Sequence, residues 1–249
     1  MKIVAANFKC NLTRAGTLHY CNELQKFLHP LSTIREASKF SCSQEDLHKS
    51  TDTQVVIFPN QTSLTHNEFE KFIVGAQNAH CVQNGGFTGE IGLEQLAEFG
   101  INSVLIGHSE RRGFFNEDKT TIAKKFEFFA NKNFRIFFCI GEDLEARKNG
   151  NVDKFLRTLC EGIDLGYENL IVAYEPIWAI GTGVSASIEE IQQTHESLRA
   201  FISTPLLYGG SVNETNARAI MQIPNVDGVL VGSASLDIRK FQQIIQSAL

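Results

Sequence analysis

Short runs of apolar residues alternate with amphipathic segments along the whole chain. The runs have the near-continuous Val, Ile, Leu and Phe content that is typical of strands buried on both faces, as in a parallel sheet. There are eight of them, and they cover Ile3–Ala6, Val55–Phe58, Phe72–Ala76, Ser103–Ile106, Arg135–Ile140, Leu170–Tyr174, Pro205–Tyr208 and Gly228–Val231. The pattern therefore predicts eight parallel strands.

The segments between these runs carry apolar residues at helical spacing. The clearest are Thr120–Asn131 and Ser187–Phe201, and the first residue of the second segment forms a capping box with Glu190. Asn213 is expected to cap a further helix over Glu214–Met221. Strands and helices thus alternate from one end of the chain to the other.

Eight strands with intervening helices in 249 residues match a (β/α)8 barrel, which makes residues 1–249 a single domain. A doubly wound open sheet is the alternative, because periodicity does not distinguish a closed sheet from an open one. Residues 30–53 are polar and rich in serine, and they are predicted to be an irregular surface insertion. Residues 59–71 leave room for one short helix at most.

Composition excludes several classes of function. Lys and Arg total 23 and Asp and Glu total 28, and a net charge of −5 argues against a nucleic-acid partner. No stretch approaches the ~20 apolar residues of a membrane helix, so no membrane association is expected. The apolar run in the N-terminal segment MKIVAANFK is too short, and a charged residue follows it too soon, for a secretory signal. Six dispersed cysteines without a CxxC pair are then expected to be reduced thiols in the cytoplasm.

Polar and charged residues follow directly after several predicted strands. In a (β/α)8 barrel the reactive groups lie at the carboxyl ends of the strands, so these residues are expected to converge on one rim. Lys9 follows the first strand, and its compact ammonium group suits a phosphate. An ordinary surface lysine is the alternative, and Lys9 alone is a weak signal.

His108 and Glu175 follow the fourth and sixth strands. His108 precedes Ser109-Glu110, which opens a helix, and the positive end of the helix dipole favours a neutral imidazole that can donate a hydrogen bond. Glu175 precedes Pro176, and a carboxylate held between apolar walls can act as a general base. The alternatives are a structural histidine and a structural ion pair between the glutamate and an arginine.

Two glycine clusters and one apolar loop complete the rim. Gly209-Gly210-Ser211 and Gly232-Ser233 follow the seventh and eighth strands, where exposed backbone N–H groups beside a helix start can hold a phosphate. Either cluster alone could be a simple turn, but two on neighbouring strands favour a phosphate site. Residues 178–183 form an apolar tip followed by glycines, which predicts a lid, with a static packed loop as the alternative.

In order and spacing, six segments of the chain closely resemble the triosephosphate isomerase family. They read AANFKCN, IGHSERR, CIGE, AYEPIWAIGTG, YGGSVN and DGVLVGSAS. The resemblance spans nearly the whole chain, and AYEPIWAIGTG is highly specific to that family. It implies a TIM barrel and an isomerase of glycolysis and gluconeogenesis. The implied reaction interconverts dihydroxyacetone phosphate and D-glyceraldehyde 3-phosphate through an enediolate.

The resemblance also implies a role for each residue at the strand ends. Glu175 matches the base and His108 matches the electrophile, and a Glu base beside a neutral His is the known arrangement of this family. Asn7 and Lys9 match the groups that stabilise the developing charge and hold the substrate, with Glu110 in support. The implied phosphate-binding residues are Gly181, Ser211, Gly232 and Ser233. Of these, Ser233 stands where many members have glycine.

The family is typically a homodimer, in which a loop after the third strand reaches the neighbouring subunit. Residues 77–90 match that loop, with Thr88 as the reaching residue and Glu90 pairing with Arg111. The resemblance implies no metal ion and no organic cofactor.

Two other functions are alternatives. A phosphosugar aldolase or epimerase on the same barrel would need a Schiff-base lysine within a strand or a set of metal ligands, and the sequence offers neither. A phosphate-binding protein without catalysis would have no use for Glu175 as a desolvated base.

Overall fold

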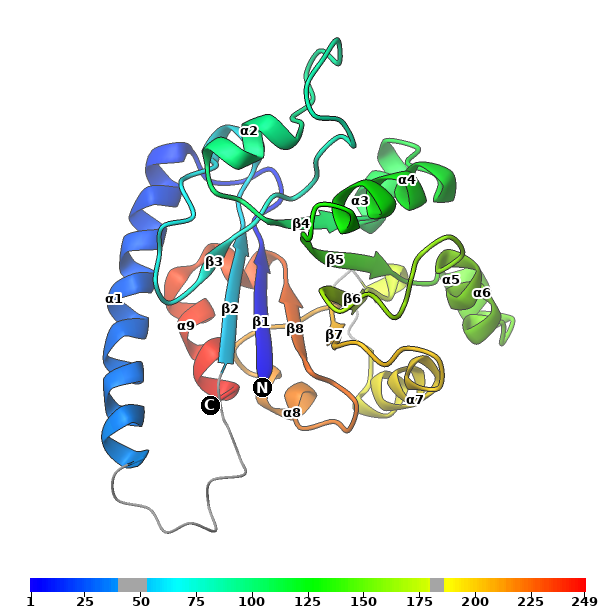
Figure 1. Cartoon of the computed structure of the whole chain (residues 1–249). Coiled ribbons are helices and arrows are strands. Elements are labelled where there is room, and N and C mark those ends of the chain that lie inside the picture. Colours follow the sequence, from blue (N-terminus) through cyan, green and yellow to red (C-terminus); the bar gives the residue numbers. More distant parts are fainter. Residues whose placement is uncertain (40–52, 180–185) are drawn as a thin grey trace.

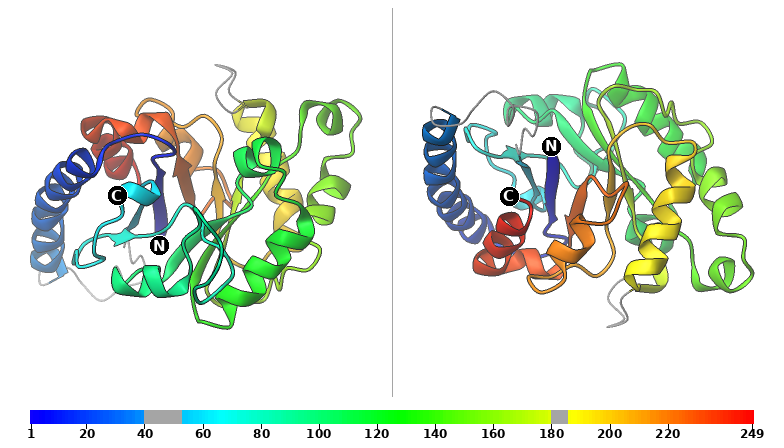
Figure 2. Two further views of the ribbon diagram at one scale, coloured as in Figure 1. Left: turned by 90° about the horizontal axis from the view of Figure 1, so that it is seen from above. Right: turned by 90° about the horizontal axis from the view of Figure 1, so that it is seen from below.

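The computed structural model describes residues 1–39, 53–179 and 186–249, and the side chains of residues 30–39 lie outside this description. Eight strands form the centre of the molecule and the helices lie outside them, as both views of Figure 2 show. The strands are β1 (Lys2–Asn7), β2 (Thr53–Phe58), β3 (Ile73–Val74), β4 (Ser103–Ile106), β5 (Arg135–Ile140), β6 (Leu170–Tyr174), β7 (Leu206–Tyr208) and β8 (Gly228–Val231).

The strands form one parallel sheet in the order β3-β2-β1-β8-β7-β6-β5-β4 (Figure 1). Ala76, just beyond the short β3, joins the two ends of this sheet through a parallel bridge to Val104. The N–H of Ala76 donates to the carbonyl of Ser103, and the N–H of Leu105 donates to the carbonyl of Ala76, both at 2.9 Å. The sheet is therefore closed into a (β/α)8 barrel, and the open doubly wound alternative is wrong.

Alternate residues of each strand pack into two separate cores. In β1, Ile3 and Ala5 belong to the core inside the barrel, whereas Val4 and Ala6 face the surrounding helices. Phe58 and Phe137 meet edge to face inside the barrel, with ring centroids 5.0 Å apart. Burial on both faces explains why the strands read as continuous apolar runs.

The helices of the described residues include those predicted over residues 120–131 and 187–201. They are α1 (Arg14–Lys39), α2 (Leu93–Glu98), α3 (Ser109–Phe114), α4 (Lys119–Ala130), α5 (Leu144–Lys148), α6 (Val152–Leu159), α7 (Ile188–Arg199), α8 (Ala217–Met221) and α9 (Ile238–Ser247), with 3-10 turns η1 (Gln61–Ser63), η2 (Ile177–Ala179) and η3 (Ser233–Leu236). The predicted capping box between Ser187 and Glu190 opens α7. None of the described helices is both long enough and apolar enough to cross a membrane.

Two local predictions are wrong. Residues 30–39 belong to α1, and Thr53 already belongs to β2, so the predicted irregular segment 30–53 is helical at its start. The good helix formers in residues 35–39 (REASK) outweigh the serines on which the prediction rested. Residues 40–52 lie outside the described part of the chain.

The second error concerns the start of α8. Its N-cap is Asn216 rather than Asn213. The side chain of Asn213 accepts hydrogen bonds from the backbone N–H groups of Thr215 and Asn216, at 2.9 and 3.2 Å. Asn213 therefore closes a turn ahead of the helix, a local bond that competes with helix formation.

Candidate active site

The predicted site residues line one cavity at the carboxyl ends of the strands. The cavity has a volume of about 1050 Å³, and its walls come from the segments that follow β1, β4, β6, β7 and β8. The sequence-predicted residues among its lining are Asn7, Lys9, His108, Glu175, Ser211, Gly232 and Ser233. Gly181 was predicted to bind phosphate and lies outside the described residues. The convergence of five strand ends on one cavity is the arrangement that the sequence predicted.

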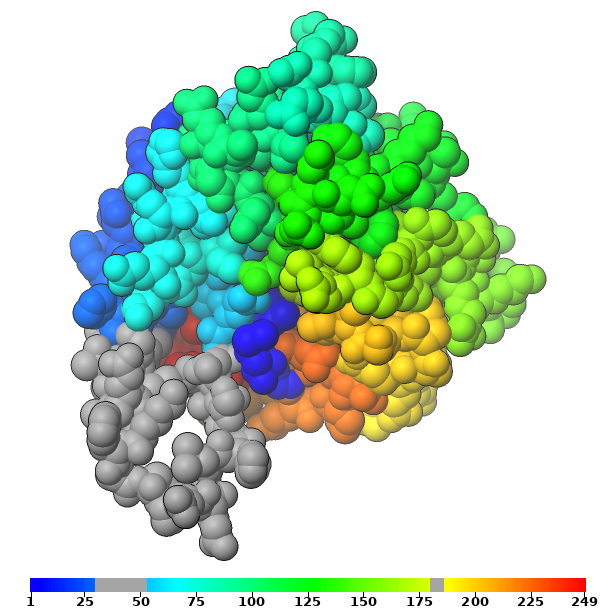
Figure 3. Space-filling view, in the orientation of Figure 1, coloured from blue at the N-terminus to red at the C-terminus, as the bar shows by residue number. Residues whose placement is uncertain are grey.

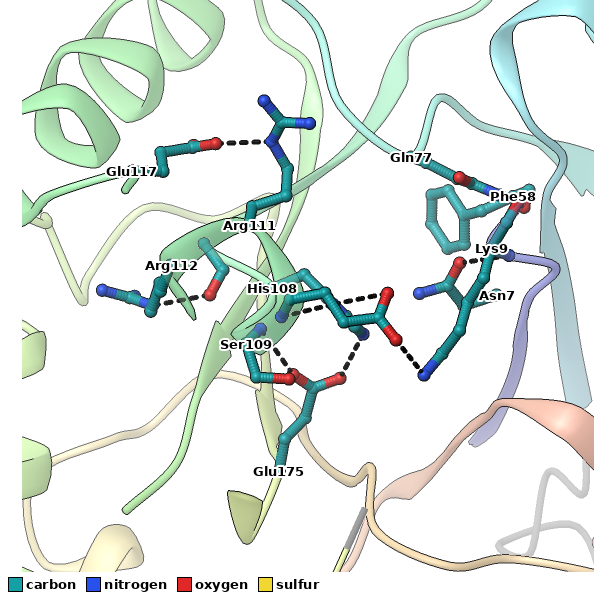
Figure 4. Close-up of polar contacts among 12 residues, drawn as sticks. Asn7, Lys9, Phe58, Gln77, His108, Ser109, Arg111, Arg112, Glu117 and Glu175 are labelled. Atoms are coloured by element: carbon teal, nitrogen blue, oxygen red, sulfur yellow. Dashed lines mark hydrogen bonds and ion pairs between the residues drawn. The ribbon is translucent and has the colours of Figure 1, made fainter. Parts of the chain in front are cut away.

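His108 and Glu175 face each other across the cavity floor (Figure 4). Nε2 of His108 lies 3.2 Å from Oε1 of Glu175. Both side chains are buried, with exposed fractions of 7% for His108 and 4% for Glu175. The imidazole and the carboxylate therefore reach a common small ligand from two different strands.

The start of helix α3 fixes the protonation pattern of His108. His108 is the N-cap of α3, and its Nδ1 accepts a hydrogen bond of 3.2 Å from the backbone N–H of Glu110. An acceptor nitrogen carries no proton, so the proton of the neutral ring is on Nε2. The ring thus presents an N–H donor to the cavity, which agrees with the expectation from the helix dipole.

Glu175 is held in place by the backbone and by a thiol. Its Oε2 accepts a long hydrogen bond of 3.4 Å from the N–H of Ser109. A Cβ on Gly209 would lie 2.8 Å from Cγ of Glu175, so only glycine leaves room for the carboxylate arm. Burial, the charge of Glu175 and a hydrogen bond to it raise the pKa of the Cys139 thiol well above its usual range. Cys139 therefore stays protonated as a donor beneath Glu175, a contact that sequence reasoning missed.

The backbone of Lys9 has the left-handed conformation, with φ of +49°. Such a conformation is unfavourable for a residue other than glycine and occurs where surrounding contacts impose it. Nε2 of Gln77 donates to the carbonyls of Lys9 and Phe58, at 2.9 and 2.8 Å, and Oδ1 of Asn7 accepts from the N–H of Lys9 at 3.0 Å (Figure 4). Nζ of Lys9 lies 2.7 Å from Oε1 of Glu110. These contacts aim the ammonium group into the cavity from the side opposite Glu175.

The predicted phosphate-binding turns form the wall beside Lys9. A Cβ on Gly232 would lie 3.7 Å from Cε of Lys9, which places this turn next to the ammonium group. Ser233 begins η3, so backbone N–H groups at the start of this turn are not used by the turn itself. The hydroxyl of Ser211 donates to the carbonyl of Ala179 at 2.8 Å and thus ties the other turn to the start of the predicted lid. These turns can therefore bind an anion next to the ammonium group of Lys9.

Comparisons with known proteins identify the family. The sequence profile described as triosephosphate isomerase matches residues 2–248. The triosephosphate isomerase of Helicobacter hepaticus is 51% identical over 250 residues, covering 100% of both chains. Those of Sulfurovum sp. and Wolinella succinogenes are 48% and 47% identical, each covering 98% of this chain and 99% of the relative. The chain belongs to the triosephosphate isomerase family. It is accordingly an isomerase that interconverts dihydroxyacetone phosphate and glyceraldehyde 3-phosphate in glycolysis.

A buried polar network supports the base of the predicted lid of this isomerase. Oε1 of Glu142 accepts hydrogen bonds of 3.0 Å from the hydroxyl of Tyr174 and from Nε1 of Trp178. The guanidinium of Arg147 lies 3.4 Å from the same oxygen and 5.3 Å from the centre of the Trp178 ring. Sequence reasoning did not assign a role to Glu142, although the CIGE segment that contains it was one of the signals of the family.

The loop expected to reach a second subunit projects from the barrel at the top of Figure 1 and Figure 3. Thr88 and Glu90 are exposed on it. Within the chain, Arg111 does not pair with Glu90, because Nε of Arg111 lies 2.5 Å from Oε2 of Glu117. Glu117 is in turn bound to the buried Lys125, with Nζ at 2.8 Å from Oε1. The pair between Glu90 and Arg111 belongs to the prediction for the loop that reaches a second subunit, and it stays a prediction.

Proposed function

We propose that Glu175 is the general base of the isomerisation and that His108 is its electrophile. Glu175 removes a proton from the carbon next to the substrate carbonyl and returns it to the neighbouring carbon. Nε2–H of His108 donates to the substrate oxygens while the enediolate forms. The observation that carries this proposal is the 3.2 Å separation between Oε1 of Glu175 and Nε2 of His108 in a buried site. Groups this close serve two adjacent carbons of one substrate.

Lys9 and Asn7 are the residues that stabilise negative charge as it develops on the enediolate. Fixed donors in a site that excludes water are worth more than the same donors in water. The left-handed backbone of Lys9 and its contacts with Gln77 and Asn7 hold the ammonium group in advance of the reaction. Glu110 supports both sides of the site: its Oε1 lies 2.7 Å from Nζ of Lys9, and its backbone N–H donates to Nδ1 of His108 at 3.2 Å.

The phosphate of the substrate is held by backbone N–H groups at Gly181, Ser211, Gly232 and Ser233. The position of Gly232 beside Lys9 supports this assignment, because the lysine charge adds to the attraction of the N–H groups for a dianion. Ser233 begins η3 and lines the cavity.

An isotope experiment tests the assignment of the base. The enzyme is mixed with dihydroxyacetone phosphate in heavy water, without added metal or cofactor. Aldose that carries deuterium at C2 is expected from the wild type, because the base exchanges its proton with solvent while the enediolate is bound. A Glu175→Gln variant is expected to lose this exchange, whereas Glu161→Gln, on an exposed residue, keeps it. Exchange at the wild-type rate in Glu175→Gln would contradict the proposal.

We infer that the enzyme is a homodimer built through the projecting loop of residues 77–90. The exposed fractions of Phe87, Phe114 and Phe115 are 44%, 79% and 66%, and exposed aromatic residues of this kind mark interaction surfaces. Thr88 is at the tip of the loop that enters the second subunit, and Glu90 and Arg111 lie at the contact. Sedimentation is expected to give twice the chain mass for the wild type and the chain mass for Phe87→Asp. A wild-type monomer would refute this inference.

The proposed location is the cytoplasm, and the proposed pathway roles include gluconeogenesis as well as glycolysis. The described cysteines are free thiols, as expected in a reducing compartment. Cell fractionation with an antibody against the chain tests the location, and a secreted pool would contradict it.

A further inference from the structure

Tyr20 of α1 is bound to the turn that follows β8, although the two lie at opposite ends of the chain. Its hydroxyl donates a hydrogen bond of 2.8 Å to the carbonyl of Ser235 in η3. Tyr20 is 4% exposed and Ser235 is fully buried. Burial raises the pKa of the Tyr20 hydroxyl well above its usual range, so the group remains a donor. A buried hydroxyl without a hydrogen-bond partner is energetically unfavourable. The bond from Tyr20 is therefore retained, and it restrains the position of the turn.

Ser235 in turn restrains Gly232 through two hydrogen bonds. Both its hydroxyl and its backbone N–H donate to the carbonyl of Gly232, at 2.7 and 2.9 Å. The bonds run from Tyr20 to Ser235 and from Ser235 to Gly232, the first residue of the anion-binding turn. The peptide that joins Gly232 to Ser233 carries both the fixed carbonyl and the N–H of Ser233, and both residues line the cavity.

The ring of Tyr20 also packs against the neighbouring segment of the cavity wall, which carries Lys9. It meets the ring of Phe8 edge to face, with centroids 4.8 Å apart, and lies 6.3 Å from the ring of Phe241. Phe8 stands between Asn7 and Lys9 in the sequence. Tyr20 thus contacts both the segment that carries the ammonium group and the turn beside it.

We propose that Tyr20 is a positioning residue that, through Ser235, orients the N–H groups of Gly232 and Ser233 toward the substrate phosphate. This inference rests on the proposed phosphate site. Tyr20 does not line the cavity, and its hydroxyl bonds to the turn, so the effect of the hydroxyl is confined to the binding of the phosphate group.

The test is a Tyr20→Phe variant, which keeps the ring and removes the hydroxyl. Tyr167→Phe is the matched control, because the hydroxyl of Tyr167 also donates at 2.8 Å to a backbone carbonyl, that of Phe134, away from the cavity. A net hydrogen bond corresponds to a factor of about five in an equilibrium constant. We expect Tyr20→Phe to raise the inhibition constant of inorganic phosphate and the KM for glyceraldehyde 3-phosphate about fivefold, and Tyr167→Phe to change neither.

Turnover of D-glyceraldehyde, which has no phosphate, separates positioning from general damage. It is expected to be the same in the wild type and in Tyr20→Phe, because catalysis at the carbonyl end does not depend on the turn. If turnover of D-glyceraldehyde falls together with phosphate affinity, or if phosphate affinity is unchanged, the positioning role is refuted.

A Gly232→Asp variant distinguishes a failure of the positioning role of Tyr20 from a failure of the proposed phosphate site. A carboxylate at this position repels the phosphate, and a Cβ fits there at 3.7 Å from Cε of Lys9. Loss of phosphate inhibition in Gly232→Asp with no effect of Tyr20→Phe would overturn the positioning role alone. Unchanged phosphate inhibition in Gly232→Asp would overturn the phosphate site itself.

Discussion

Nε2 of His108 and Oε1 of Glu175 lie 3.2 Å apart at the ends of β4 and β6. Neither strand is the neighbour of the other in the sheet, because β5 lies between them. The distance between the two side chains therefore depends on how the sheet closes into a barrel, as well as on the local structure of each segment. It allows both side chains to reach one small ligand, as the proposed roles of base and electrophile require.

Shortening Glu175 to aspartate is expected to lower kcat by ~10²-fold, because it retracts the carboxylate by about 1 Å from the carbon that it deprotonates. Steady-state kinetics in both directions measures the effect. Glu161→Asp is the control, since this exposed residue pairs with Lys119 away from the cavity. Wild-type turnover in Glu175→Asp would exclude Glu175 as the base.

Removing the imidazole in His108→Ala is expected to lower kcat by ~10²–10⁴-fold, the range of general acid–base assistance. The inhibition constant of inorganic phosphate is expected to stay within about twofold of the wild type, because the proposed phosphate site is built on other turns. Kinetics and phosphate inhibition are measured on the same preparation. Loss of phosphate binding would make His108 a binding residue instead.

Adding a methyl group in Gly209→Ala is expected to displace Glu175, since the new Cβ would lie 2.8 Å from Cγ of Glu175. A displacement of the base by a fraction of 1 Å predicts a fall in kcat of about 10-fold or more. Gly16→Ala in α1 is the control, because its Cβ would meet no atom closer than 3.5 Å. Equal kcat values in the two variants would show that the glycine is not required for the placement of Glu175.

Truncating the buried Lys125 is expected to destabilise the fold. Its Nζ lies 2.8 Å from Oε1 of Glu117 and donates to Oδ1 of Asn78 at 2.6 Å. Burial opposes the ionised form of Glu117, but the bonds from Lys125 and Arg111 hold the pKa of Glu117 below its usual value. Lys125→Ala leaves this carboxylate incompletely paired, which costs about 3 kcal/mol in the free energy of unfolding.

Denaturant unfolding measures this loss, with Lys124→Ala as the control on the exposed face of the same helix. Surface substitutions of this kind change stability by less than about 0.5 kcal/mol. A similar stability for the two alanine variants would contradict a structural role for the buried lysine.

Because His195 is buried, the protein is expected to lose stability as the pH is lowered. Burial lowers the pKa of His195 from 6.5 to about 4, and Nε2 has no hydrogen-bond partner among the described residues. The unfolded state therefore binds a proton near pH 6.5, whereas the folded state does not until about pH 4. This contribution to stability is complete above pH 6.5 and is lost as the pH falls toward 4, by about 3 kcal/mol in all.

Urea unfolding at pH 7 and at pH 4.5 measures this dependence. In His195→Gln, which does not titrate, the difference in stability between the two pH values is expected to be smaller than in the wild type. An equal difference in both proteins would assign the acid sensitivity to other groups.

The sequence by itself determined the elements and their order. The strands are buried on both faces, so they are continuous apolar runs, and six of the eight were predicted to within one residue at both ends. The capping box of Ser187 and Glu190 is also local, since both partners lie within one helical turn. The motifs around His108 and Glu175 identified the family because they stand directly after strands. In a (β/α)8 barrel the reactive side chains lie at these strand ends, so the position of such a residue in the chain also indicates its chemistry.

Only the tertiary structure decided which distant groups touch. Closure of the barrel through Ala76, the contact of Cys139 with Glu175 and the bond from Tyr20 to Ser235 all join residues that no local pattern links. Apolar periodicity fixes which face of a segment is buried, whereas partner choice depends on how the barrel brings the segments together.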